Sequence, residues 1–237
     1  MKSPYRASRR EFVRLTGIAG AMGLTSSRAG LAVSQGAAAP TPDQVLARLL
    51  EGNKRFVNGQ LTHPGRKPED FAALAEGQAP VAVIVGCADS RVAPELVFDQ
   101  GVGDLFVVRV AGNIVSGAGP TVKGSIEFAV GELGARLIMV LGHTQCGAVK
   151  AAIEHIDSND ALPGSIGELI DPIRPAVAAM KGQSGDKLEN VTKANVLMGV
   201  QRLKGLDPIL SKLAKSGELK LVGATYDLRT GVVKVFD

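Results

Sequence analysis

The stretch Val81–Arg91 reads VAVIVGCADSR, a continuous apolar run followed at once by a polar, reactive segment. The run from Val81 to Gly86 contains no charged residue, which is typical of a β-strand buried on both faces. Such strands belong to parallel sheets covered by helices, and ligands bind beyond the carboxyl ends of the strands. The segment that begins at Cys87 therefore indicates a site at the edge of a parallel sheet.

Two further apolar runs, Leu105–Val110 and Leu137–Leu141, repeat the pattern of a strand buried on both faces. Between them, Thr121–Leu133 places apolar side chains at helical spacing. This order predicts an α/β fold with a mainly parallel sheet and flanking helices. The other predicted elements are an N-terminal helix capped by Thr41, helices at Pro68–Glu76, Ser165–Met180 (broken by Pro172 and Pro175), Leu188–Leu203 and Ile209–Lys215, and a hairpin of Leu219–Tyr226 and Val232–Phe236.

Cysteine occurs only twice in the 237 residues, and each thiol lies beside other reactive groups. Cys87 begins the first segment, while His143 and Cys146 lie three positions apart in a second, where the head of a helix would let both face one point. Two thiolates and one imidazole favour zinc, and three protein ligands leave a fourth position open, as in catalytic sites. The sequence therefore predicts one zinc ion per chain, joining two distant segments.

Three other interpretations of the two cysteines remain open at this point. Cys87 and Cys146 can form a disulfide if the protein is exported. They can also be inert buried thiols, since free cysteine is among the most buried residue types. Finally, the metal site can be purely structural, with Asp89 as a permanent fourth ligand.

Several motifs in this chain occur together in one known family. They are Cys87–Val92 (CADSRV), Gly142–Ala148 (GHTQCGA), Glu51–Phe56 (EGNKRF), Asp99–Arg109 (DQGVGDLFVVR) and Ala111–Asn113 (AGN). With 56 positions between Cys87 and His143, the chain resembles the β-carbonic anhydrases from about Thr41 to the C-terminus. The resemblance implies the fold of that family, zinc bound by Cys87, His143 and Cys146, and the reversible hydration of CO2 to bicarbonate and a proton.

Asp89 and Arg91 lie two residues apart in the turn after the first strand, where the guanidinium can hold the carboxylate in a bidentate grip. Asp89 would then accept a hydrogen from the attacking water and direct that water at CO2. If Arg91 releases it, Asp89 can move onto the metal as a fourth ligand. We expect both residues to be catalytic. Because two thiolates offset the charge of zinc, we also expect activity to rise toward alkaline pH.

Two residues are candidates for substrate binding. Gln78 matches a position where the family carries a glutamine that donates its amide to a substrate oxygen, and Gly147 begins a helix whose N–H groups can meet bicarbonate oxygens. Arg109 and Tyr226 fall where some bacterial members bind an inhibitory bicarbonate. That site also uses a tryptophan, and Ile84 occupies its place here, so bicarbonate regulation is not expected.

Other activities and partners are consistent with the same motifs. The same metal chemistry can act on carbonyl sulfide or carbon disulfide, and a non-catalytic zinc-binding or redox-responsive protein is a third hypothesis. In the family the N-terminal helix packs across a partner subunit, so the resemblance implies a homodimer or homotetramer. Gly101-Val102-Gly103 lacks the third glycine of a dinucleotide loop, which gives no support to nucleotide binding.

Residues 1–39 have the features of an export signal. They contain Arg9-Arg10, a short weakly apolar stretch and a small-residue segment that ends before Pro40, as in a twin-arginine signal peptide. A retained N-terminal arm is the alternative. We expect a mature domain of residues 40–237 in the periplasm or otherwise exported, without stable membrane insertion.

The basic character of the whole chain comes from this N-terminal segment. It holds six of the 27 basic side chains but one of the 23 acidic ones, so the remainder is near neutral. A near-neutral domain without tryptophan does not suggest nucleic-acid binding.

Overall fold

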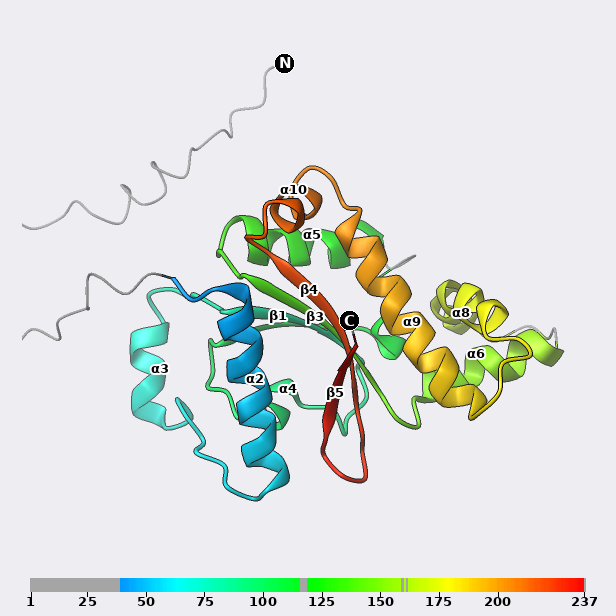
Figure 1. Ribbon diagram of the computed structural model, residues 1–237, viewed down its shortest axis with the longest axis horizontal. Coiled ribbons are helices and arrows are strands. Elements are labelled where there is room, and N and C mark those ends of the chain that lie inside the picture. Colours follow the sequence, from blue (N-terminus) through cyan, green and yellow to red (C-terminus); the bar gives the residue numbers. More distant parts are fainter. Residues whose placement is uncertain (1–38, 116–118, 159, 161, 237) are drawn as a thin grey trace, which may run out of the picture. The chain divides into compact units, whose positions relative to one another are not determined.

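The apolar runs form one sheet with the strand order β2-β1-β3-β4-β5 in the described part of the chain (Figure 1). Strands β1 to β4 pair with one another in parallel, and β5 pairs antiparallel with β4. This confirms the mainly parallel α/β fold and the C-terminal hairpin. The strands are β1 Ala82–Gly86, β2 Leu105–Arg109, β3 Leu137–His143, β4 Lys220–Tyr226 and β5 Val233–Phe236.

The structure is a computed structural model that describes residues 39–115, 119–158, 160 and 162–236. The predicted export signal, including Arg9 and Arg10, lies outside the described residues apart from Ala39. The chain from Pro40 onward groups into one unit. Among the described helices, none has both the length and the apolar character needed to cross a bilayer.

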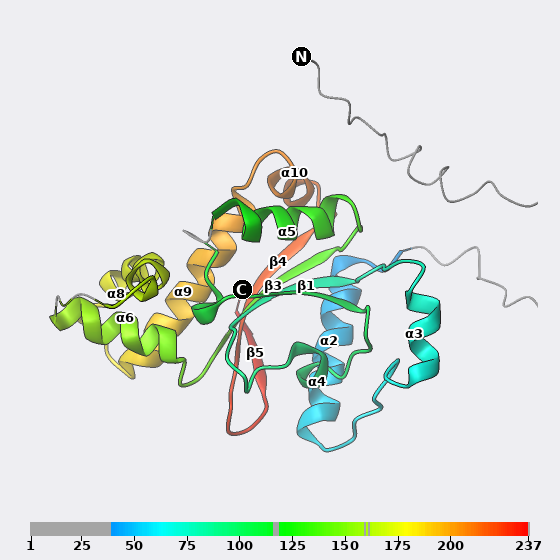
Figure 2. The same ribbon diagram turned by 180° about the vertical axis from the view of Figure 1, so that it is seen from behind.

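Helices cover both faces of the sheet, as Figures 1 and 2 show. Side chains of β1 alternate between two apolar clusters, because successive residues of a strand point to opposite faces. Ile84 packs in the cluster that contains Leu49 of α2, and Val83 packs with Ile126 of α5 and Val200 of α9. The helices involved are α2 Pro42–Val57, α4 Pro94–Val97, α5 Gly119–Gly131, α9 Lys187–Lys204 and α10 Leu210–Lys215.

A third apolar cluster contains both Cys87 and Cys146. It is built from a group of short helices in which the predicted helix Ser165–Met180 is broken near its prolines, as expected. The elements of this region are η1 Ala111–Asn113, α6 Gly147–Ser158, α7 Ile166–Ile170, η2 Asp171–Ile173 and α8 Arg174–Ala179. The remaining described helix, α3 Pro68–Leu74, follows α2 in the chain.

The burial of the strands differs from the prediction at β2. All residues of β1 and β3 are buried, as expected for central strands. Strand β2 is at the edge of the sheet, and its residues from Phe106 to Arg109 are half-buried or exposed. The prediction of burial on both faces was therefore wrong for this strand. An apolar run does not reveal whether a second strand pairs on its outer side.

Helix α2 is capped at its N-terminus and is attached to other segments of the chain near its C-terminal end. Thr41 and Gln44 form the predicted capping box. Further along, Asn53 donates to the carbonyls of Val97 and Gly231 and accepts from the Val233 N–H at 2.9 Å. Since Asn53 is buried and all these bonds cross long stretches of sequence, α2 is held firmly against the sheet of its own chain.

The buried carboxylate of Asp99 ties the segment after α2 to the loop before β2. It is fully buried, pairs with Arg55 at 2.8 Å, and accepts hydrogen bonds from the Thr62 N–H and hydroxyl and from the His63 N–H. Arg66 lies 3.9 Å away. Burial raises the pKa of Asp99, but the hydrogen bonds from Thr62, Arg55 and His63 outweigh it and hold that pKa well below its usual range.

We expect Asp99→Asn to lower the free energy of unfolding at pH 7 by about 2 kcal/mol, the scale of hydrogen bonds to a buried charge. The folded-state pKa lies below the unfolded value of about 3.9, so this stability is present above that value and is lost as the pH falls through the folded pKa. Urea unfolding should therefore show a difference between wild type and variant that shrinks below about pH 4. Asp43→Asn, which removes an exposed carboxylate from the first turn of α2 and its pair with Lys220, is the control. A constant difference across this pH range would contradict the assignment.

Candidate metal centre

The sheet brings the two reactive segments together at the carboxyl ends of neighbouring strands. Cys87 directly follows β1, and His143 is the last residue of β3. The two strands pair in parallel with Gly86 opposite Leu141, so both segments leave the sheet at the same edge. Cys146 follows in the turn that leads into α6. His143 thus ends a strand, and the prediction that it and Cys146 share the head of a helix was wrong.

The ligand atoms of Cys87, His143 and Cys146 lie within 4.8 Å of one another, and all three side chains are buried. A tetrahedral zinc ion with Zn–S bonds of about 2.3 Å separates its ligand atoms by roughly 4 Å, so the cluster has the size of a zinc site. Both cysteines are free in the structure, which therefore does not show the disulfide of the first alternative. No other cluster of this kind is found among the described residues.

The imidazole of His143 is oriented for metal binding. Its Nδ1 lies 2.9 Å from the Thr144 carbonyl oxygen, which can only accept, so Nδ1 carries the hydrogen and Nε2 presents a lone pair. Nε2 is buried without a hydrogen-bond partner. Thr144 is itself fixed, because its N–H donates to Tyr226 and its hydroxyl accepts from the Leu228 N–H. A buried, unpartnered nitrogen beside two thiols fits a bound metal ion.

The two thiols are electrostatically coupled. The hydrogen bond from Cys146 lowers the pKa of Cys87 to about 4 against the effect of burial, with His143 and the Gly112 N–H acting in the same direction. The same contact, together with burial, raises the pKa of Cys146. Burial lowers the pKa of His143, but the Cys87 thiolate outweighs this and raises it. The first thiol proton is thus lost easily and the second is retained, and a cation would allow both sulfurs to be anionic.

Asp89 and Arg91 form the expected pair beside this cluster. Arg91 Nε and Nη2 donate to the two carboxylate oxygens at 2.9 and 2.7 Å, and the Arg91 N–H donates at 2.9 Å. The side-chain hydrogen bonds of Arg91 hold the pKa of Asp89 well below its usual range, against a smaller effect of burial. Oδ2 of Asp89 lies 3.8 Å from Nε2 of His143. The carboxylate is therefore ionised, held by Arg91 and close to the ligand atoms.

A sequence model of the family described as Carbonic anhydrase matches residues 82–233. The chain is 42% identical over 183 residues to Carbonic anhydrase 2 of Mycobacterium tuberculosis, an alignment that covers 77% of this chain and 87% of that protein. This chain belongs to the β-carbonic anhydrase family.

Solved structures of the family share this fold. The β-carbonic anhydrase CcaA is similar with a TM-score of 0.64 and 29% identity, covering 81% of this chain and 95% of that one. One of two tetrameric β-carbonic anhydrases from Sordaria macrospora is similar with a TM-score of 0.62 and 26% identity, covering 81% and 96%. Both similarities span nearly the whole of the related protein, which places the likeness over the complete β-carbonic anhydrase fold.

The remaining sequence candidates are only partly brought together. Gly147 is exposed at the start of α6, directly after Cys146. Gln78 lies before β1, at the amino end of the strands, beside Leu74 and Leu105, and so it does not join the cluster within one chain. The sheet thus separates the two residues proposed to meet the substrate.

The two residues that match a second bicarbonate site in some bacterial members have structural contacts here. Arg109 Nε and Nη2 donate to the carbonyls of Cys87 and Asp89. Tyr226 is buried, with its carbonyl accepting from the Thr144 N–H.

Sequence reasoning assigned no role to Gly112, whose N–H donates to Cys87 Sγ at 3.2 Å. Gly112 has a positive φ of 74°, and an added Cβ would lie 3.0 Å from Ile173 and 3.2 Å from Ala148. Only the glycine in the motif Ala111–Asn113 hinted at this close approach, because glycine is the residue that best tolerates such a backbone.

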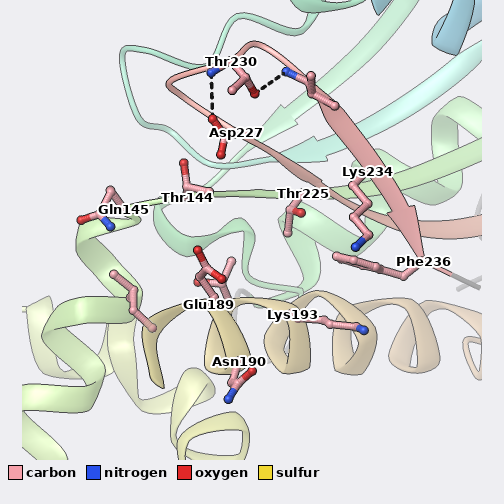
Figure 3. A pocket seen from close by; sticks show the side chains of 13 residues that line it. Thr144, Gln145, Glu189, Asn190, Lys193, Thr225, Asp227, Thr230, Lys234 and Phe236 are labelled. Atoms are coloured by element: carbon pink, nitrogen blue, oxygen red, sulfur yellow. Dashed lines mark hydrogen bonds between the residues drawn. The ribbon is translucent and has the colours of Figure 1, made fainter. Parts of the chain in front are cut away.

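A cavity of about 470 Å³ lies between α9, the β4–β5 hairpin and the turn after β3 (Figure 3). Thr144 and Gln145 form the wall nearest the metal centre, and Lys193 lies over the ring of Phe236. None of the three ligand side chains lines this cavity, so it is separate from the cluster. The remaining lining residues are Leu188, Glu189, Asn190, Thr192, Thr225, Asp227, Thr230, Val232 and Lys234.

Proposed function

We propose that this protein catalyses the reversible hydration of CO2 to bicarbonate and a proton, with one zinc ion per chain. The observation that carries the proposal is the convergence of Cys87, His143 and Cys146 beside an Asp89 carboxylate held by Arg91. The family membership supports the same reaction.

The metal would be held by Cys87 Sγ, Cys146 Sγ and His143 Nε2, the atoms that converge in the structure. When bound, zinc supplies a Lewis acid that makes water more acidic and a better nucleophile at moderate pH. The chain holds these ligands in place through the Gly112 N–H at Cys87 and the Thr144 carbonyl at His143. Such supporting bonds orient ligands and keep the imidazole in the required tautomer.

Asp89 would position the reacting water. Because its pKa is held low, the carboxylate is an acceptor throughout the working pH range. Arg91 donates twice to Oδ1 but only once to Oδ2, which leaves a lone pair of Oδ2 free to accept a hydrogen from water and to direct the water oxygen at the carbon of CO2. One proton leaves for solvent as bicarbonate forms, so the reaction balances without a further reactant.

We also propose that bicarbonate oxygens meet the Gly147 N–H, where the partial positive charge of α6 favours an anion. A substrate role for Gln78 requires a second copy of the chain, because this residue lies at the opposite end of the sheet from its own metal centre. This supports a homodimer or homotetramer, in line with the related proteins from Sordaria macrospora, which are described as tetrameric.

Stopped-flow hydration of CO2 by zinc-loaded protein tests the function, with carbonyl sulfide and carbon disulfide in parallel assays. We expect hydration of CO2 that rises toward alkaline pH and stops when a chelator removes zinc. Faster turnover of a sulfur substrate than of CO2 would overturn the proposed substrate. No turnover of any of the three would favour a non-catalytic zinc protein.

Arg91→Ala is expected to retain stoichiometric zinc but to lose about 100-fold in kcat, the scale of a lost orienting or acid–base group. Without the guanidinium, Asp89 is free to turn away from the reacting water or to ligate the metal itself. Metal analysis and CO2 hydration kinetics measure the two effects, with Arg174→Ala, an exposed arginine paired with Asp171, as the control. A variant with wild-type kcat at alkaline pH would show that the pair is structural.

We propose that residues 1–39 direct export of the folded, zinc-loaded domain of residues 40–237 and are then removed. Replacing both Arg9 and Arg10 with lysine should remove most of the protein from the periplasmic fraction, and the N-terminal sequence of the exported wild type should begin near Ala39 or Pro40. Unchanged periplasmic yield of the double variant would mean that another route is used.

A further inference from the structure

Beyond Gly86 the backbone pairing of β1 with β2 continues for only one more step. The Val110 N–H donates to the Gly86 carbonyl at 3.1 Å, and the Ala88 N–H donates to the Val110 carbonyl at 3.3 Å. The next step would use the Gly112 N–H, but Gly112 turns with a φ of 74° and its N–H donates to Cys87 Sγ. Regular pairing therefore ends where the reactive segment begins.

The guanidinium of Arg109 replaces the missing backbone pairing. Its Nε donates to the Cys87 carbonyl at 3.0 Å, and its Nη2 donates to the Asp89 carbonyl at 2.6 Å. These carbonyls belong to the residues on either side of Ala88, so one planar, rigid donor fork holds two peptide groups of the segment between β1 and the turn at Ser90. Asp89 is thus held through its carboxylate by Arg91 and through its main-chain carbonyl by Arg109, and the Val92 N–H also donates to that carbonyl at 3.0 Å.

We propose that Arg109 is a positioning residue that keeps the Asp89 carboxylate within the bidentate grip of Arg91. A two-bond grip requires the carboxylate plane to match the guanidinium plane, so it depends on where the Asp89 backbone lies. The Arg91 side chain is 55% exposed and is therefore poorly fixed by packing, which leaves the Asp89 backbone as the better-fixed side of the pair. This inference rests on the proposed function, because the pair has a catalytic effect only if it orients a reactant.

Arg109 donates to the main-chain carbonyls of Cys87 and Asp89 and not to the ligand atoms of the metal centre. Arg109 is the last residue of an edge strand and belongs to none of the three apolar clusters, so its removal leaves the packing of the core unchanged. The metal ligands are held by other groups, Cys87 Sγ by the Gly112 N–H and His143 by the Thr144 carbonyl. Loss of Arg109 should therefore loosen the Asp89 segment while the fold and the zinc remain.

The test compares full-length, zinc-loaded Arg109→Ala and Arg109→Lys with wild type and with Arg174→Ala. For Arg109→Ala we expect stoichiometric zinc and a Tm within about 3 °C of wild type. We expect its kcat for CO2 to fall about 10- to 100-fold, the scale of a misplaced reacting group, while its KM changes less than about threefold. Lysine keeps the positive charge but lacks the planar donor fork, so Arg109→Lys should recover less than half of the loss in kcat, measured on a logarithmic scale. In an Asp89→Ala background, Arg109→Ala should have no further effect on kcat.

A crystal structure of zinc-loaded Arg109→Ala provides a measurement that does not depend on turnover. We expect the bonds from Arg91 Nε and Nη2 to Asp89, 2.9 and 2.7 Å here, to be broken. An intact pair, an unchanged kcat, a loss of zinc or fold, or full additivity with Asp89→Ala would each overturn the proposal. If wild type fails to hydrate CO2, the proposed function fails, while the crystal structure still decides whether Arg109 positions Asp89.

Discussion

Cys146→Ala is expected to lose nearly all its zinc and to reduce CO2 hydration to the background rate. Cys146 supplies one of two thiolates in a three-residue ligand set, and a buried alanine offers no replacement atom. Binding free energies of about 10–16 kcal/mol for structural zinc sites show how much affinity such ligand sets provide. Because the metal joins the segments after β1 and β3, its loss should also lower the Tm of the holoprotein.

Metal analysis after dialysis against a weak chelator measures the first effect, and thermal unfolding measures the second. Lys150→Ala is the matched control, because Lys150 is exposed on the first turn of α6 yet contributes no ligand. The control should retain one zinc per chain. Stoichiometric zinc in Cys146→Ala would refute the ligand assignment and, with it, the proposed reaction centre.

Gly52→Ala is expected to lower the free energy of unfolding by about 4 kcal/mol or more, which places it among the most damaging substitutions. In an open helix the same change stabilises by about 1 kcal/mol, because alanine is the better helix former. Here an added Cβ would lie 1.7 Å from the Phe98 carbonyl oxygen and 3.1 Å from Gln100 Nε2. The backbone cannot yield locally, so α2 must move away and weaken the bonds of Asn53.

Gly124→Ala provides the matched control for this prediction. Gly124 lies within α5, and an added Cβ there meets no atom within 4 Å. We expect this variant to be as stable as wild type or slightly more stable in urea unfolding. A Gly52→Ala protein that behaved like the control would show that α2 does not pack as closely on the segment after α4 as the structure indicates.

Both central strands could be predicted because burial on two faces imposes a local composition. Val83 and Val85 face one cluster and Ile84 the other, so every position must be apolar. The ligand set could also be predicted, since Cys87, His143 and Cys146 are the residue types that zinc selects. Asp89 and Arg91 followed from their spacing, and the structure shows the predicted bidentate pair. In each case the signal lies in residue type or in the spacing within one short segment.

Several features depended on contacts between distant segments and left little trace in the sequence. Strand β2 is half-exposed because no strand pairs on its outer side, and strand order is a property of the whole sheet. Gln78 lies at the opposite end of β1 from Cys87, a separation that follows from strand direction. Asp99 looked like any loop carboxylate, and only the fold surrounds it with Arg55 and Thr62.

By itself, the sequence determined the identity of the reactive groups and the parallel sheet edge on which they lie, because ligand chemistry and strand burial both act through residue type. Only the tertiary structure decided how these groups are held. Arg109 and Gly112 act on Cys87 and Asp89 across strands, through a guanidinium and a backbone N–H whose targets no local pattern specifies. Residue type sets what a group can do, while distance and direction, which decide whether it does so, arise when the strands pair.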